Sequence, residues 1–201
     1  FAGLAPPVTT LARLAGGPAA AAGLLVREGK DLALAEQCLR VPAPLALALA
    51  GAGIAWPGTR PLTTAAAPLP ASWRDAIGRQ AEALRAGHLQ GLVLEHGDEG
   101  DVDAVAAALA GALGRRAVRL ERAAAAEPGF ALFAELSDLL PVLDLDAHDG
   151  RCDDGLPRLL ATTRGRGAAA LAGFVRWRLP PPPAAERATL WQGAGVPPPT
   201  A

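Results

Sequence analysis

A regular alternation of apolar runs and helix patterns between Gln90 and Gln192 is the feature that most constrains the fold of this chain. Apolar runs predict strands within residues 91–96, 116–121, 141–146, 157–163 and 173–179, and the patterns between and after them predict helices within residues 102–113, 128–139 and 183–192. Strands that alternate with helices form a parallel sheet covered on both faces. We therefore predict an α/β fold with a three-layer parallel-sheet core, whose ligands bind beyond the carboxyl ends of the strands.

The region upstream of this core predicts a smaller module and a linker. Leu24–Val26 and Glu36–Arg40 flank a turn and predict a β-hairpin, which a short helix within residues 42–51 follows. Pro, Gly and Thr dominate the next segment, which shows no periodic pattern. The predicted division is a winged-helix-like N-terminal module at 1–54, a linker at 55–71 and an α/β domain at 72–201. Ser72 is predicted to cap the first helix of that domain, with Trp73, Ile77, Ala81 and Leu84 on its buried face.

Charge and composition limit the partners. The 19 basic and 20 acidic residues leave a net charge of -1, which gives no general attraction to nucleic acid or to an anionic membrane. Cys38 and Cys152 show no CxxC spacing, so we expect free thiols in a reducing compartment. The chain starts at Phe1 and has neither a basic leader nor a long apolar span, so we expect a cytoplasmic piece of a longer protein with no membrane contact.

The turn after the first predicted core strand occupies the place of a phosphate-binding loop. A working loop of the form GxxxxGK[ST] wraps phosphates with backbone N–H groups, and its Lys and hydroxyl bind the phosphates and Mg²⁺. The matching window runs from Gly97 to Ala104 and includes Gly100, Val102 and Asp103. Val102 replaces the second glycine, Asp103 the Lys and Ala104 the Ser or Thr. A carboxylate about 4 Å from a phosphate costs roughly 4 kcal/mol before screening, so ordinary ATP binding is not favoured.

The carboxylates of this turn allow three other interpretations. Asp98, Glu99, Asp101 and Asp103 suit a solvated acidic turn at the N-terminus of the next helix, where negative charge is favoured. The same groups could hold a divalent cation if they converge. A contact with a partner protein is the third interpretation.

Asp146 follows the predicted strand 141–146 and resembles the Walker B Asp that orders Mg²⁺ in phosphoryl-transfer enzymes. The next residue is Ala147, where a hydrolytic enzyme of this class commonly has Glu. Asp146 is thus a candidate cofactor-binding residue without its catalytic neighbour.

From about Leu69 to Gln192 the order of these features resembles a module of the AAA+ ATPase family, within the P-loop NTPases. The resemblance implies that Thr163 or Arg164 occupies the sensor-1 position and that Gly173 and Phe174 occupy an Arg-Phe pair. It also places Glu186 and Arg187 at an "ER" helix start. The sensor Asn is missing, and Gly173 stands where the arginine finger would be.

Residues upstream of Leu69 are similar to the region before the degenerate first module of bacterial tandem AAA+ proteins. This implies a catalytically silent structural or regulatory module in an ATP-driven remodelling assembly, with no cofactor of its own. ATP and Mg²⁺, which the family uses, would bind in a second module outside this chain. Expected partners are other modules of the same protein, further copies in a homo-oligomer and a protein client. Whether the segment is itself an enzyme stays undecided, because the P-loop Lys and the Walker B Glu are absent.

Two rival hypotheses remain. In one, the domain is an active ATPase in which Asp144 and Asp146 hold Mg²⁺ and Arg164 or Arg166 supplies positive charge. In the other, the N-terminal module binds nucleic acid through three dispersed basic residues of the hairpin, which are Arg27, Lys30 and Arg40. Three such charges are few for a nucleic-acid footprint, so a protein partner is favoured.

Overall fold

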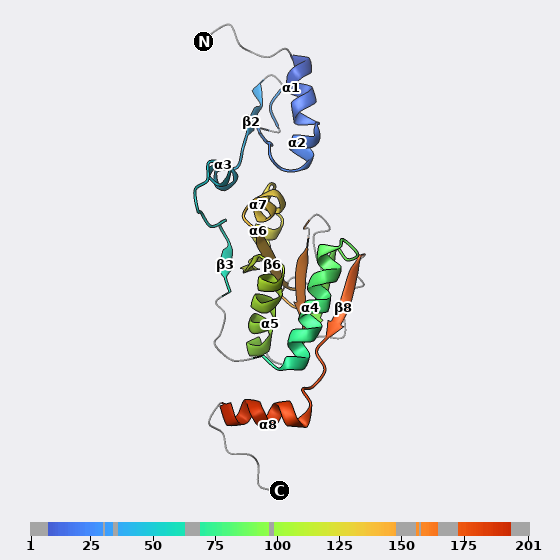
Figure 1. The fold of residues 1–201 in the computed structure, drawn as a ribbon. Coiled ribbons are helices and arrows are strands. Elements are labelled where there is room, and N and C mark those ends of the chain that lie inside the picture. The colour runs from blue at the N-terminus through green and yellow to red at the C-terminus, as the bar shows by residue number, and fades with distance from the viewer. Residues whose placement is uncertain are drawn as a thin grey trace. The chain divides into compact units, whose positions relative to one another are not determined.

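The computed structural model describes residues 8–29, 31–33, 36–62, 69–96, 99–147, 156, 158–164 and 173–193. The chain forms two compact units, and neither is continuous in sequence (Figure 1). The N-terminal unit combines Phe1–Thr59 with Glu121–Ser137, and the sheet unit combines Arg60–Leu120 with Asp138–Ala201. The segment between strands β5 and β6 therefore belongs with the N-terminal unit.

The sheet unit is built on a six-stranded sheet with the order β3-β5-β6-β7-β4-β8. Its strands are β3 (Thr59–Pro61), β4 (Gly91–Glu95), β5 (Arg116–Leu120), β6 (Leu139–Asp144), β7 (Leu159–Thr163) and β8 (Phe174–Arg178). The pairs β5–β6, β6–β7, β7–β4 and β4–β8 are parallel. The predicted α/β fold with a parallel sheet flanked by helices is confirmed at this level.

Strand β3 is an edge strand that the sequence did not predict. Leu62 N donates to Ala117 O at 3.0 Å and Glu121 N donates to Gly58 O at 2.9 Å, so β3 runs antiparallel to β5. It lies within the range 55–71 that was predicted as a linker. Its three residues end in Pro61, which suits an edge because proline cannot donate a ladder hydrogen bond.

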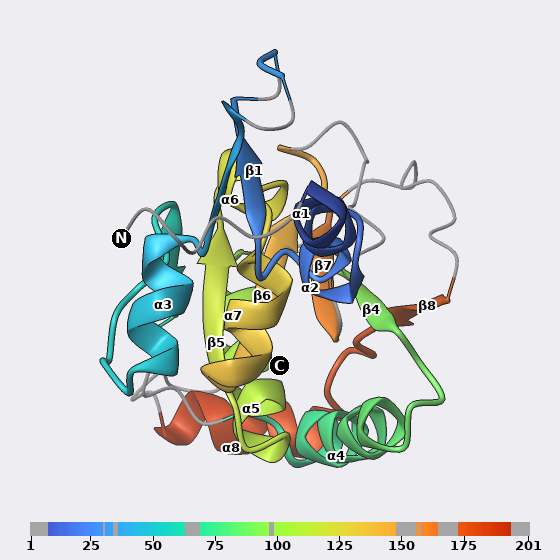
Figure 2. The ribbon, with the colours of Figure 1, turned by 90° about the horizontal axis from the view of Figure 1, so that it is seen from above.

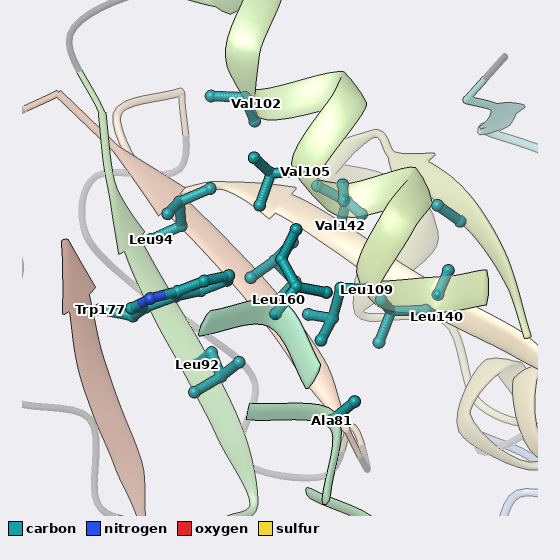
Figure 3. Packing of buried hydrophobic residues seen from close by; sticks show 14 of the residues in the cluster. Ala81, Leu92, Leu94, Val102, Val105, Leu109, Leu140, Val142, Leu160 and Trp177 are labelled. Atoms are coloured by element: carbon teal, nitrogen blue, oxygen red, sulfur yellow. The ribbon is translucent and has the colours of Figure 1, made fainter. Parts of the chain in front are cut away.

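Helices α4 (Ala71–Arg85) and α5 (Glu99–Ala112) pack side by side on one face of the sheet (Figures 1 and 2). Their apolar side chains meet Leu92 and Leu94 of β4, Leu160 of β7 and Trp177 of β8 in one cluster (Figure 3). The predicted face of α4, from Trp73 to Leu84, is buried in this cluster. Each fully buried Leu or Val contributes about 1.5–3 kcal/mol, so this cluster fixes both helices on the sheet.

Two sequence predictions about helix ends are wrong. Pro70, and not Ser72, is the N-cap residue of α4, so Ser72 lies inside the first turn. The helix predicted over 128–139 is the shorter α7 (Phe130–Leu136). It stops because Asp138 adopts a left-handed conformation with φ of 50°, after which Leu139 begins β6. The third helix of the sheet unit, α8 (Ala184–Gly193), matches its prediction.

The N-terminal unit contains the predicted hairpin and short helix. Strands β1 (Val26–Glu28) and β2 (Cys38–Arg40) pair antiparallel, and α3 (Ala43–Leu49) follows. The helices α1 (Val8–Ala15), α2 (Pro18–Ala21) and α6 (Arg122–Ala125) were not predicted. Helix α3 packs against α7, which lies far from it in sequence (Figure 2).

Trp56 joins the two segments of the N-terminal unit. Its side chain is 2% exposed although the residue lies in the range predicted as a linker. Its ring centroid lies 5.7 Å from that of Phe130 in an edge-on arrangement and 5.1 Å from that of Phe133, and its Nε1 donates to Glu127 Oε2 at 2.9 Å. Trp56 is thus a core residue of this unit.

Candidate functional site

The strand order identifies the edge of the sheet at which a site is expected. β4 lies between β7 and β8, while the chain that leaves β4 through α5 returns at β5, on the far side of β6 and β7. The strand order therefore reverses beside β4. Ligands of open α/β sheets bind beyond the carboxyl ends of the strands at such a reversal. Since β4, β6 and β7 are parallel, the residues that follow them meet at this carboxyl edge.

Asp146 lies at this carboxyl edge, two residues after the end of β6. Its Oδ1 accepts a hydrogen bond from Thr163 Oγ1 at 2.8 Å, and its Oδ2 accepts one from Arg164 N at 2.7 Å. The Walker B-like residue and both sensor-1-like residues of the sequence prediction are therefore in direct contact. The contact joins the loop after β6 to the end of β7.

The hydrogen bond from the Arg164 backbone is the main reason why the pKa of Asp146 lies below its ordinary value. Burial opposes this lowering, while the Thr163 hydroxyl and the charges of His96 and Arg164 add to it. Asp146 is therefore a carboxylate at neutral pH. Its backbone N–H in turn donates to Asp144 Oδ1 at 2.9 Å, which fixes the turn after β6.

His96, which sequence reasoning did not select, lies at the same edge. Its backbone N–H donates to Thr163 O at 3.1 Å and extends the pairing of β4 with β7 by one residue. Its Nδ1 is buried and has no hydrogen-bond partner among the residues that the structure describes. A polar residue directly after a buried apolar strand is the sequence signal that could have indicated it.

The connection between β4 and α5 is much shorter than the predicted window. β4 ends at Glu95 and α5 begins at Glu99, so only residues 96–98 separate them. Gly97 and Asp98 lie outside the described residues, whereas Gly100 is already part of α5. A phosphate loop needs free backbone N–H groups, and in a helix only those of the first four residues lack a partner within the helix. Asp103 and Ala104 lie beyond those four residues.

The side chains of the window point to different surroundings. Val102 is 1% and Ala104 7% exposed, so both are buried residues of α5 and neither faces a ligand. Asp103 forms an ion pair and hydrogen bond with Arg119 Nη2 of β5. The carboxylate at the Lys position is thus neutralised within the protein. Local sequence patterns do not reveal this partner, because Arg119 lies sixteen residues after Asp103, in strand β5.

The acidic groups near this edge do not assemble a metal centre in the described part of the chain. No cluster of three or more His, Cys, Asp or Glu side chains is arranged there to hold an ion. Glu95 forms an ion pair with Arg176 of β8 at 3.1 Å. Asp144 and Asp146, the pair expected to hold Mg²⁺ in the active-ATPase hypothesis, each accept a backbone hydrogen bond, and Arg166 lies outside the described residues.

The remaining residues that the resemblance selected form hydrogen bonds with residues other than Asp146, Thr163 and Arg164. Gly173 precedes β8 with φ of 77°, and its carbonyl accepts a hydrogen bond from Gln90 N at 3.0 Å. A Cβ at this position would lie 2.5 Å from Gln90 Oε1, so an arginine would not fit without a shift. Glu186 contacts the N-terminus of α4, while Arg187 Nη1 donates to Pro182 O at 2.9 Å.

Comparisons of this chain with protein-family models, with curated proteins and with solved structures found no match. Within the described part of the chain, no helix has the length and apolar character needed to cross a membrane.

Proposed function

We propose that this chain is part of an AAA+-type protein and that its sheet unit is a catalytically silent structural or regulatory module. In this proposal another module of the same protein binds ATP and Mg²⁺. The sheet unit then acts by packing against neighbouring modules or copies, or against a protein client, in a remodelling assembly.

The AAA+-type scaffold is supported by the convergence of three segments. The resemblance assigns the loop before α5, Asp146 and residues 163–164 to one site, although they are far apart in sequence. In the structure β7 lies between β4 and β6, so these segments reach one edge, and Asp146 bonds both Thr163 and Arg164.

The position at which α5 begins supports the proposal that the module does not bind or hydrolyse ATP. A helix that begins at Glu99 leaves residues 96–98 as the whole connection, which is too short to wrap a polyphosphate. The cation nearest to Asp103 is Arg119, and the two are already paired. A phosphate would have to break this pair and displace the acidic first turn of the helix.

Titration of the chain with a fluorescent ATP analogue and Mg²⁺ tests the proposal. We expect no saturable binding up to about 1 mM, which corresponds to less than about 4 kcal/mol of binding free energy. Saturable micromolar binding that unlabelled ATP displaces would refute it and favour the active-ATPase hypothesis.

The double variant Asp103→Lys with Ala104→Thr is the matched control for the loop geometry. It restores the missing chemical groups, yet we expect no gain in affinity because position 104 is buried and position 103 lies beyond the first turn. A clear gain, with unchanged circular dichroism, would show that the connection retains a phosphate-loop geometry.

No observation favours the nucleic-acid hypothesis for the N-terminal unit. Arg40 forms an ion pair with Glu28 of the same hairpin at 2.8 Å, and Lys30 lies outside the described residues. This pairing reduces the positive charge that the hairpin could offer to phosphates.

A further inference from the structure

Within the sheet unit, helix α8 lies beside the N-terminal end of α4 (Figure 1). Polar contacts join α4 to α8 and to the segment just before it. Ser72 Oγ donates a hydrogen bond to Glu186 Oε2 at 2.7 Å. The Ser72 backbone N–H donates to the other oxygen of this carboxylate, Oε1, at 3.2 Å. Four residues before α8 begins, Pro180 O accepts a hydrogen bond from Trp73 Nε1 at 2.8 Å.

The Glu186 carboxylate supplies the cap that α4 lacks. The first backbone N–H groups of a helix have no partner within the helix, and an N-cap side chain usually accepts one of them. The N-cap residue of α4 is Pro70, whose side chain has no acceptor. Glu186 accepts from Ser72, the second residue of the helix, and places a negative charge at the positive end of the helix dipole.

The side chains that the structure describes on α8 form no apolar seam comparable to that of α4. Among its described side chains, from Ala184 to Leu190, none is buried, and Glu186, Ala188 and Leu190 are half-buried. By contrast, α4 buries a full face from Trp73 to Leu84. The Thr189 hydroxyl donates to Ala185 O of its own helix at 3.1 Å.

We propose that Glu186 is a latch that makes α8 a two-state arm, docked when its carboxylate caps α4 and released when it does not. Docking of α8 and order in the first turn of α4 then rise and fall together. This inference does not depend on the proposed function, because it concerns contacts remote from Asp146.

Hydrogen exchange of the whole chain tests the latch. In Glu186→Ala we expect exchange of the Ser72 and Trp73 amides and of the α8 amides to rise together by about 5- to 30-fold, the factor that corresponds to losing a cap. Arg187→Ala on the same helix is the matched control and should leave the first turn of α4 unchanged.

Glu186→Gln keeps an acceptor oxygen but removes the charge, so its increase should be intermediate, and it serves as the milder variant if Glu186→Ala disturbs folding. Unchanged α8 exchange in both variants would overturn the latch. Faster exchange of α8 without any change at Ser72 and Trp73 would equally overturn it, because docking and capping would then be independent.

Discussion

Replacing Trp56 should destabilise the N-terminal unit far more than its place in a Pro- and Gly-rich segment suggests. Trp→Ala substitutions in well-packed cores cost about 3–5 kcal/mol. We expect a cost in this range for Trp56→Ala, because the side chain is 2% exposed and packs on the rings of Phe130 and Phe133.

Trp56→Phe distinguishes the contribution of the aromatic contacts from that of the Trp56 hydrogen bond. It keeps an aromatic contact and removes the bond from Nε1 to Glu127 Oε2. Glu127 is exposed and can be hydrated once the bond is lost, so we expect only about 1–2 kcal/mol. The difference between the two variants then measures the packing of the ring.

Equilibrium urea unfolding followed by circular dichroism gives the free energies of unfolding, and hydrogen exchange of the α7 amides assigns the loss to the N-terminal unit. Ile54→Ala, at a residue that is 41% exposed, is the nearby control and should change stability by no more than about 0.5 kcal/mol. A cost below about 1 kcal/mol for Trp56→Ala would refute the reasoning, since residues 55–58 would then behave as the predicted linker.

Three further predictions concern a glycine, a carboxyl group and an ion pair. Gly129→Ala should cost well over 1 kcal/mol in thermal unfolding, because φ is 92° and the new Cβ would lie 2.8 Å from Gly23 O. Gly51→Ala, with φ of 79° but nothing within 4 Å, should cost distinctly less, and equal costs would contradict the proposed clash. Because the pKa of Asp146 is lowered in the folded protein, its carboxylate stabilises the fold above pH of about 4. This stabilisation is lost as the pH falls through the folded pKa. Asp146→Asn should therefore flatten the acid limb of the stability curve by less than about 1 kcal/mol, given the exposure of this group, and an unchanged limb would count against the Arg164 contact. A double-mutant cycle of Asp103→Asn and Arg119→Met should give a coupling of about 0.5–1 kcal/mol that shrinks in 1 M salt, and strict additivity would mean that the pair contributes nothing.

The regular elements of the sheet unit were predictable because their signals are local. Apolar runs such as residues 92–94 and the helical spacing of Trp73, Ile77, Ala81 and Leu84 are properties of short windows, and tertiary packing agrees with them. The resemblance selected Asp146, Thr163 and Arg164 as candidate residues, but neither it nor any local pattern predicted the hydrogen bonds between them. No spacing in the sequence places β7 between β4 and β6.

The window from Gly97 to Ala104 shows a helix start that the sequence analysis placed too late, at Val102. Residues 97–104 align by position with the phosphate-loop motif GxxxxGK[ST]. In the structure, however, residues from Glu99 onward already belong to helix α5. Val102 and Val105 are buried in the cluster that packs α5 on the sheet, and this burial favours a helix that begins close to the end of β4. Sequence alone could not weigh that packing against a glycine-spaced turn.

The sequence by itself determined the α/β class of the fold and the order of strands β4 to β8 with the helices α4, α5, α7 and α8. It also determined that no Lys, hydroxyl or Glu side chain stands at positions 103, 104 and 147. Tertiary structure alone decided which distant groups are partners: Asp103 with Arg119, Glu186 with Ser72, and Trp56 with the inserted segment that carries Phe130. The physical reason is the sequence separation over which each kind of interaction acts. Periodicity and turn chemistry act over a few residues, whereas ion pairs, helix caps and aromatic contacts form only where folding brings separate segments together.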